Sequence, residues 1–101
     1  MVIAFRDFSD EEYFVTREVL EVAGIKVVTA STKTGVAMGS QGGEAAVDAI
    51  LSEVNVSDFD GVIFIGGAGA HKYINDPKFH RLAKETLTSR KLLAAICIAP
   101  A

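Results

Sequence analysis

The chain has 101 residues, with 10 Lys and Arg against 13 Asp and Glu, so its formal net charge is −3, and half of its residues are hydrophobic. This apolar share offsets the entropy of ordering and excludes a disordered chain, while a single Cys excludes an internal disulfide framework. The mild acidity argues against a nucleic-acid-binding surface, which needs clustered Lys and Arg. No apolar run reaches the roughly 18–20 residues of a membrane span, and no basic region opens the chain as in a signal peptide. We therefore expect a cytoplasmic protein with no nucleic-acid or membrane partner.

The first part of the chain alternates between strand-like and helix-like patterns. Residues 1–5 form a short apolar run, which predicts a buried strand. Residues 9–23 have helical periodicity and stop at Gly24, a residue type that is favoured just after a helix. The β-branched run at residues 25–30 predicts a second strand. A stretch rich in Ser, Thr and Gly follows at residues 31–43.

The middle of the chain predicts a hairpin and a buried strand. Residues 36–38 and 45–47 are expected to pair as a small hairpin. A turn is expected at residues 58–60, before the run 62–65, which is apolar on both faces as in a parallel sheet covered on both sides. The glycine-rich segment 66–69 ends this strand.

A second helix and a last strand follow. The helix is expected over residues 77–89, with Asp76 as its N-cap and Pro77 at its first position. Residues 92–96 then form another fully apolar strand. The alternation predicts an α/β fold with a mainly parallel sheet covered by helices on both faces.

The last predicted strand lies close to the end of the chain. It runs into Cys97, and the sequence stops at Ala101. A parallel strand that is buried on both faces needs a following helix to cover it, since bare apolar surface is unfavourable. We therefore expect residues 1–101 to form a single domain that is incomplete at its C-terminal end, so that a missing segment or a second chain completes it. The alternative is a naturally short domain with a frayed tail.

Cys97 directly follows the last predicted strand. In open α/β sheets, ligands bind outside the carboxyl ends of the strands. A nucleophile at a tight strand-to-helix turn exposes its side chain, with backbone N–H groups beside it that can bind an oxyanion. A helix N-terminus behind the thiol favours the thiolate. The alternative is a buried cysteine that serves as a small apolar side chain.

Glu12 is the acid of the first predicted helix that points along the apolar stripe, on the same face as Thr16, Val19 and Ala23. A carboxyl in this position needs hydrogen-bonding partners, and it can exchange a proton during catalysis. The alternative is a capping box, in which Glu12 accepts a hydrogen bond from the backbone N–H of Ser9. From these residues alone, the capping box is the favoured interpretation.

The glycine-rich segment 66–69 either brings free N–H groups to an anion or forms a tight turn only. It does not match a dinucleotide-binding fingerprint, because Lys72 stands where the third glycine belongs. His71 lies just beyond it and is a candidate to reach the same cleft, with a loop surface position as the alternative. No metal-ligand spacing is present, and the acidic loop at residues 6–10 argues against an FMN site. We expect no metal and no cofactor.

Two runs of the sequence resemble the ThiJ/PfpI superfamily: VIFIGG at residues 62–67 and LAAICIAP at residues 93–100. The first loop and helix match as well, through Glu12 and Gly24. The resemblance covers the whole chain and corresponds to the N-terminal part of a family domain. It implies a flavodoxin-like three-layer sandwich of the class I glutamine amidotransferase-like type.

The resemblance also implies roles for individual residues. Cys97 resembles the nucleophile at the elbow, and Glu12 resembles the protonated glutamic acid that hydrogen-bonds the cysteine sulfur. Gly67 and Ile98 resemble the residues whose backbone N–H groups form the oxyanion hole. His71 stays a candidate substrate contact. Under this resemblance, the role of Glu12 as the partner of Cys97 outranks the capping box.

Two residues depart from the family pattern. Protease-like members place His directly after the cysteine, where this chain has Ile98. Since Ile98 cannot act as a base, the intracellular cysteine peptidase is a disfavoured alternative. The residue two positions after the cysteine is usually Gly and is Ala99 here, which tightens the elbow.

The expected function is therefore that of a cysteine-dependent hydrolase or lyase that acts on small reactive carbonyl compounds, as a glyoxalase or deglycase does in stress protection. Its partner is a small-molecule substrate, and the resemblance implies a homodimer. One alternative is a non-enzymatic redox sensor or chaperone that works through oxidation of Cys97. Another is a plain binding module on the same fold.

Overall fold

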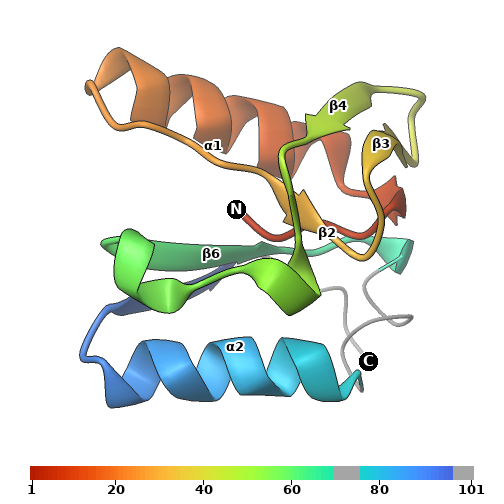
Figure 1. Cartoon of the computed structure of the whole chain (residues 1–101). Helices are drawn as coiled ribbons and strands as arrows, with labels where there is room; N and C mark the ends of the chain where they lie inside the picture. The colour runs from red at the N-terminus through yellow and green to blue at the C-terminus, as the bar shows by residue number, and fades with distance from the viewer. Residues whose placement is uncertain (70–75, 97–101) are drawn as a thin grey trace.

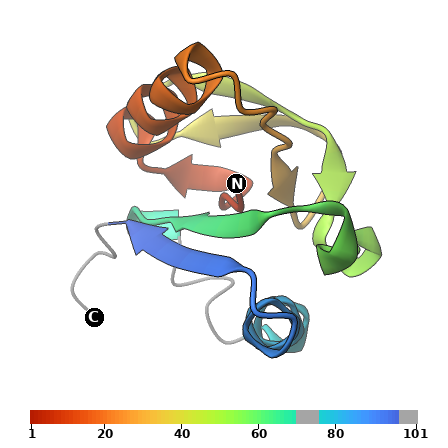
Figure 2. The same cartoon turned by 90° about the vertical axis from the view of Figure 1, so that its left-hand side faces the viewer.

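A computed structural model describes residues 1–69 and 76–96. Figure 1 shows three layers, with one helix above a central sheet and the other helix below it. Figure 2 shows the same arrangement from the side, with the two helices on opposite sides of the strands. These helices are α1 (Asp10–Val22) and α2 (Pro77–Thr88). The layers agree with the α/β sandwich that the sequence predicts.

The central sheet is parallel and consists of two paired sets of strands. Its strands are β2 (Ala30–Ser31), β5 (Ala49–Ile50), β6 (Gly61–Ile65) and β7 (Leu92–Ile96), paired as β2 with β5 and β6 with β7. Val2 joins the two sets, since it bridges both Ala30 and Phe64 in parallel orientation. The hydrogen bonds from Ile3 N to Ala30 O (3.0 Å) and from Ile65 N to Val2 O (2.9 Å) extend this junction. The apolar run at residues 1–5 is buried at Val2, Ile3 and Ala4, as predicted, but it joins the sheet through isolated bridges of Val2 and does not form the predicted strand.

A second, smaller sheet lies beside the start of α1. It contains β1 (Arg6–Phe8), β3 (Gly35–Gly39) and β4 (Glu44–Val47), with β1 parallel to β3 and β3 antiparallel to β4. The pairing of Ala37 with Ala45 confirms the predicted hairpin. Strand β1 was expected to be a loop, and it pairs irregularly, with a register shift between Arg6 and Phe8.

The predicted strand over residues 25–30 is shortened to β2. Ile25, the first residue of the predicted strand, instead takes part in the cap that follows α1, because Ile25 N donates to Leu20 O (2.9 Å). With Gly24 in the left-handed region (φ +83°), this bond forms a Schellman cap, which satisfies carbonyls of the last helical turn. Ladder bonds to the N-terminal run begin only at Val28, whose carbonyl accepts from the Met1 ammonium (2.7 Å).

The second half of the fold follows its sequence signals closely. Strands β6 and β7 occupy the two predicted apolar runs, and Asp76 caps α2 by accepting from Lys78 N (2.8 Å). A short 3₁₀ helix, Val56–Asp58, overlaps the first residue of the turn predicted at residues 58–60, and Asn55 caps it by accepting from Ser57 N (3.1 Å). No helix in the described ranges has the length and apolarity that crossing a bilayer demands.

The buried face of α1 differs from the predicted stripe. Tyr13 is its only fully buried residue, while Val19 is 63% exposed and Ala23 is also exposed. The face turns toward Tyr13 because its hydroxyl is hydrogen-bonded to the buried Thr29 Oγ1 (2.6 Å) and accepts from Arg17 (2.6 Å). The Phe8 ring packs edge-on against Tyr13, with centroids 5.3 Å apart. Glu12, one position before Tyr13, therefore lies at the border of the buried face and is half-buried.

Candidate functional site

The carboxyl of Glu12 contacts the loop that follows β6. Glu12 Oε1 accepts a hydrogen bond from the backbone N–H of Gly66 (3.1 Å). The N–H of Ser9, which a capping box would offer to Glu12, instead donates to Gly66 O (2.9 Å). The Ser9 side chain makes no capping bond either. The capping-box interpretation is therefore wrong, because neither of its two hydrogen bonds forms: the Ser9 N–H donates to Gly66 O, and the Ser9 side chain does not cap the helix.

Gly67 lies where this loop comes closest to the start of α1. Its φ is +117°, a conformation that residues with a side chain rarely adopt. A β carbon at Gly67 would lie 2.5 Å from Ser9 N and 2.9 Å from Asp7 O, and neither backbone atom can move independently of its chain. The glycine thus permits the contact between the two loops, as the sequence suggested for this segment.

The carboxyl ends of β6 and β7 leave the sheet at the same level. Ile65 is the register partner of Ile96, so Gly66 and Cys97 each follow the last paired residue of their strand. Cys97 itself lies outside the described residues, as do Ile98 and His71. Of the predicted site residues, the structure describes Glu12 and Gly67 and brings them to this edge of the sheet.

A strained residue lies in the same region. Asp7 has φ +63°, which is unusual for a residue with a β carbon, and it coincides with the register shift of β1. Asp is among the residue types that tolerate this conformation best. Asp7 lies just before α1, and its carbonyl oxygen is one of the atoms that a β carbon on Gly67 would meet, so this conformation occurs where β1 approaches the loop after β6. Local strain of this kind gathers at functional sites.

Sequence reasoning missed a second anchored carboxylate in the first turn of α1. Asp10 accepts hydrogen bonds from Gln41 N (2.9 Å) and Gly43 N (2.7 Å) at the tip of the β3–β4 hairpin. Burial works against the charged form, but these backbone N–H bonds outweigh it and lower the pKa of Asp10 below its usual value. The only sequence signal was the pair Gly39 and Gly43, which gave no indication of the partner.

The described residues at this edge include no candidate metal site. Residues 1–69 and 76–96 hold no group of three or more His, Cys, Asp or Glu side chains that could bind a metal ion. His80 is exposed on α2. The residues that the structure describes at this edge offer carboxyl groups and backbone N–H donors.

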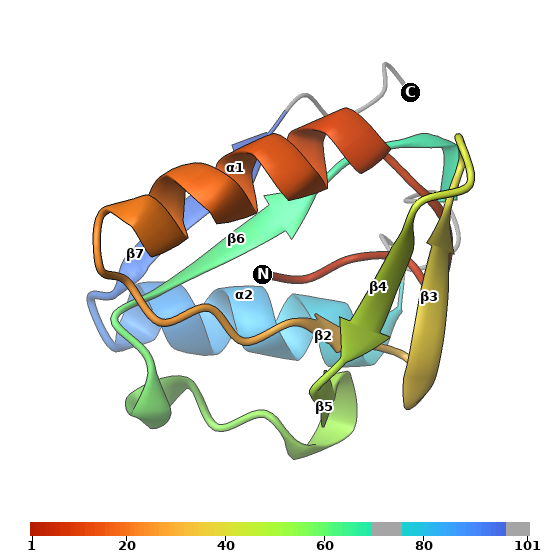
Figure 3. The same ribbon diagram turned by 90° about the horizontal axis from the view of Figure 1, so that it is seen from above.

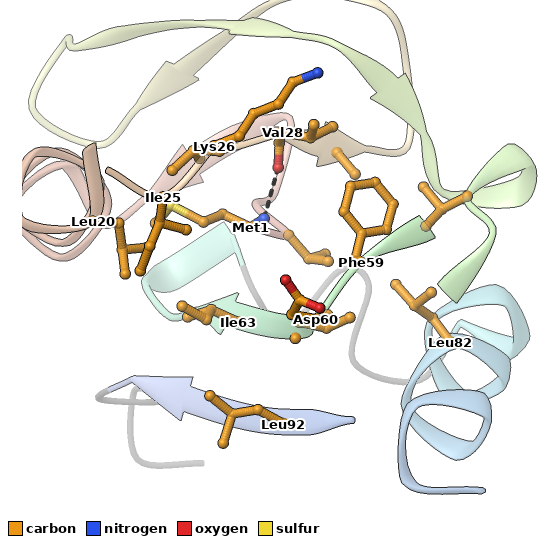
Figure 4. Close-up of a pocket in the computed structure, with 16 residues that line it drawn as sticks. Met1, Leu20, Ile25, Lys26, Val28, Phe59, Asp60, Ile63, Leu82 and Leu92 are labelled. Atoms are coloured by element: carbon orange, nitrogen blue, oxygen red, sulfur yellow. Dashed lines mark hydrogen bonds between the residues drawn. The ribbon is translucent and has the colours of Figure 1, made fainter. Parts of the chain in front are cut away.

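A cavity of about 190 Å³ lies at the opposite edge of the sheet, near the start of β6 (Figure 4). Its walls are mainly apolar, and Figure 4 shows Phe59, Ile63 and Leu82 among them. The hydrogen bond from the Met1 ammonium to Val28 O crosses one side. Glu12 and Gly67, the two predicted site residues that the structure describes, do not line this cavity.

Comparison with known proteins connects this arrangement to one family. The DJ-1/PfpI family matches residues 1–101. The crystal structure of a ThiJ/PfpI domain protein from Brachyspira murdochii is similar, with a TM-score of 0.91 and 38% identity over 93% of this chain and 54% of that one. This likeness confirms the predicted superfamily and its flavodoxin-like fold.

Several curated relatives have names that describe an activity, and a deglycase and a glyoxalase are examples. The chain is 30% identical to deglycase PYRAB04690 of Pyrococcus abyssi over 99% of its length and 60% of the relative. It is 32% identical to glutathione-independent glyoxalase DJR-1.2 of Caenorhabditis elegans over 93% of its length and 50% of the relative. The chain thus spans between half and three-fifths of the length of these relatives.

Proposed function

Since the chain belongs to the DJ-1/PfpI family, we propose that the full-length protein is a cysteine-dependent enzyme that acts on small reactive carbonyl compounds in stress protection. The names of the deglycase and glyoxalase relatives support this substrate class. We assign the nucleophile to Cys97, proton transfer to Glu12, and oxyanion binding to the N–H groups of Gly67 and Ile98. His71 is assigned a substrate contact.

The observation that carries the proposal is the hydrogen bond from Gly66 N to Glu12 Oε1 (3.1 Å). Gly66 follows Ile65, whose register partner Ile96 precedes Cys97. Adjacent strands are about 4.8 Å apart, and consecutive Cα atoms about 3.8 Å apart. The Glu12 carboxyl is therefore bound one residue beyond Ile65, whose partner Ile96 directly precedes Cys97 in the sequence, and this supports the proposed pairing of Glu12 with Cys97.

The proposed reaction begins with attack of the Cys97 thiolate on the aldehyde carbon of a substrate such as methylglyoxal. The C–S bond forms, and the π electron pair of the carbonyl moves to its oxygen, which accepts hydrogen bonds from Gly67 N–H and Ile98 N–H. Among residues 1–69 and 76–96, the N–H of Gly67 has no hydrogen-bond acceptor. Protonation of this oxygen by Glu12 gives a hemithioacetal.

The later steps move two protons within the adduct and consume one water molecule. Glu12 removes the proton from the carbon bonded to sulfur and delivers it to the neighbouring carbon, while the proton of the hemithioacetal hydroxyl passes to the ketone oxygen. The ketone thereby becomes an alcohol and the hemithioacetal becomes a thioester. Water then cleaves the C–S bond, which releases lactate and restores the thiol. We assign proton transfer to Glu12 Oε2, because Oε1 accepts the Gly66 N–H.

Methylglyoxal consumption by the full-length protein tests the proposal. In Cys97→Ser the rate should fall to that of the reaction without enzyme, and in Glu12→Gln it should fall by roughly 10²–10⁴-fold, the usual contribution of a positioned acid or base. Glu11→Gln is the matched control, since Glu11 is the neighbouring acid and is exposed. Equal rates for the wild type and Cys97→Ser would refute the cysteine mechanism.

Three expectations of the sequence analysis stay predictions of this proposal. The first is completion of the domain by further polypeptide, which agrees with the exposure of Val22 (82%) and Leu92 (67%) in the described chain. The second is a homodimer, and the third is a cytoplasmic location. Sedimentation of the full-length protein tests the second, and a monomer at micromolar concentration would refute it.

A further inference from the structure

The first turn of α1 holds two loops that are distant in the sequence. Glu12 is bound to Gly66, 54 residues further along the chain, and Asp10 is bound to Gly43, 33 residues further along. Figure 3 shows that the start of α1, the carboxyl end of β6 and the turn between β3 and β4 lie at the same side of the molecule. The two carboxyls, two residues apart, therefore link α1 to both of its neighbours at this edge.

The contact between Asp10 and the hairpin is built from several parts. Both carboxylate oxygens are used, Oδ1 by Gln41 N (2.9 Å) and Oδ2 by Gly43 N (2.7 Å), and Ser40 Oγ lies 3.5 Å from Oδ1. The hairpin is also tied by its backbone, since Ser40 N donates to Phe8 O (3.0 Å). The tip of the hairpin, residues 40–43, is thus hydrogen-bonded both to the backbone of Phe8 and to the carboxylate of Asp10, the residues on either side of Ser9.

The hairpin is shaped to receive this carboxylate. A β carbon on Gly39 would overlap the carboxylate of Asp10, and one on Gly43 would lie 2.5 Å from Oδ2 and 2.6 Å from the ring of Phe14. Gly39 N also donates to Gly43 O (2.7 Å), which closes the turn around the carboxylate. Side chains at these two positions would push the hairpin away from α1.

The charge of Asp10 strengthens the contact. Hydrogen bonds from N–H groups to a carboxylate are roughly twice as strong as those between neutral groups. A negative charge in the first turn also interacts favourably with the helix dipole. The lowered pKa of Asp10 reflects the same N–H bonds and keeps the carboxylate ionised at neutral pH.

We propose that Asp10 is a positioning residue for Glu12: by tying the hairpin tip to the first turn of α1, its carboxylate holds that turn where the Glu12 carboxyl meets the N–H of Gly66. The importance of this position for catalysis rests on the function proposed above. The coupling itself does not, because it is a property of the fold. The competing interpretation is that Asp10 only closes the hairpin and that Glu12 keeps its place without it.

The backbone amide of Gly66 distinguishes the two interpretations. Labelling the full-length protein with [¹⁵N]glycine reports Gly66 and Gly43 in the same spectrum. In Asp10→Asn the Gly66 amide proton should move upfield by at least half of the shift seen in Glu12→Ala, which removes its acceptor. If the Gly43 signal moves and the Gly66 signal does not, Asp10 only closes the hairpin and the proposal is wrong.

Asp48→Asn is the matched control. Asp48 Oδ2 also accepts from a backbone N–H, that of Thr29 (2.9 Å), but it lies on the segment between β4 and β5. Its replacement should leave the Gly66 amide unchanged, and an equal shift there would mean that loss of any anchored carboxylate has the same general effect. If Asp10→Asn does not fold, Glu12→Ala provides the reciprocal measurement, since coupling between two sites acts equally in both directions. Its Gly43 amide should shift, and an unchanged Gly43 signal would overturn the proposal.

Activity separates this inference from the proposed function. If both hold, Asp10→Asn should lower kcat for methylglyoxal by about tenfold or more, since small displacements of catalytic groups are costly, with a smaller change in KM. A protein in which Glu12→Gln is fully active but Asp10→Asn still shifts the Gly66 amide would refute the assigned role of Glu12 and leave the coupling intact. If Glu12→Gln is inactive but Asp10→Asn leaves the Gly66 amide signal unchanged, the assigned role of Glu12 is supported and the coupling is refuted.

Discussion

Replacement of Gly67 by Ala should destabilise the protein more than the same change at another glycine with positive φ. At φ +117°, a residue with a side chain costs roughly 1–2 kcal/mol for the backbone conformation alone. The added methyl group would also lie 2.5 Å from Ser9 N and 2.9 Å from Phe8 C, so the loops must separate. Overpacking of this kind costs roughly 1–3 kcal/mol. The expected loss in the free energy of unfolding is therefore about 2–5 kcal/mol.

Gly24→Ala is the control for this measurement. Gly24 also has positive φ (+83°), but a β carbon there would meet no atom within 4 Å. Its replacement should cost only the backbone contribution, about 1–2 kcal/mol. Urea denaturation of both variants gives the two free energies, provided that the m-value stays constant. If Gly67→Ala costs no more than Gly24→Ala, the close approach of the two loops carries no energetic penalty and the reasoning fails.

Two further predictions concern charge and packing. Because backbone N–H bonds lower the pKa of Asp10 in the folded protein, its stabilising contribution is complete above the unfolded value of about 3.9 and is lost as the pH falls through the lower folded value. Urea denaturation between pH 2.5 and 6 should therefore show a shallower acid loss of stability in Asp10→Asn, and identical slopes would contradict this. Leu82→Ala should lower the free energy of unfolding by about 2–5 kcal/mol, since Leu82 is 1% exposed beside the apolar cavity. Leu87→Ala, on the same helix and 62% exposed, should change it by less than about 0.5 kcal/mol, and equal effects would refute the packing argument.

The elements that the sequence predicts well have signals within a few residues. Asp76 and Pro77 mark the start of α2, and Gly24 marks the end of α1, because capping depends on local hydrogen bonds and backbone conformation. Strands β6 and β7 are recognisable because parallel strands buried on both faces are continuous apolar runs. The short strand β2 is less predictable, since its extent depends on where the N-terminal run begins to pair with it.

The candidate site was predictable only in part, because its contacts join distant segments. The pattern of Ser9 and Glu12 is the same in a capping box and in the observed site. Only the position of Gly66, 54 residues away from Glu12, decides between them. No local pattern connects Asp10 with Gly43, and so the hairpin contact was missed. The resemblance to a family predicted Cys97 as the partner of Glu12, a pairing that the local pattern does not indicate.

The way in which the Gly66 peptide is held determines which replacement of Glu12 is informative. Its carbonyl accepts from Ser9 N (2.9 Å) while its N–H donates to Glu12 Oε1 (3.1 Å), so main chain and side chain share the contact. Glutamine keeps an oxygen that can accept the same N–H, and the bond from Ser9 is unaffected. Glu12→Gln should therefore remove the transferable proton and leave the loop in place, whereas Glu12→Ala also leaves the buried N–H of Gly66 without its acceptor, at a cost of roughly 1–3 kcal/mol. A loss of activity in the glutamine variant at unchanged stability is consequently the result that separates proton transfer from support of the loop.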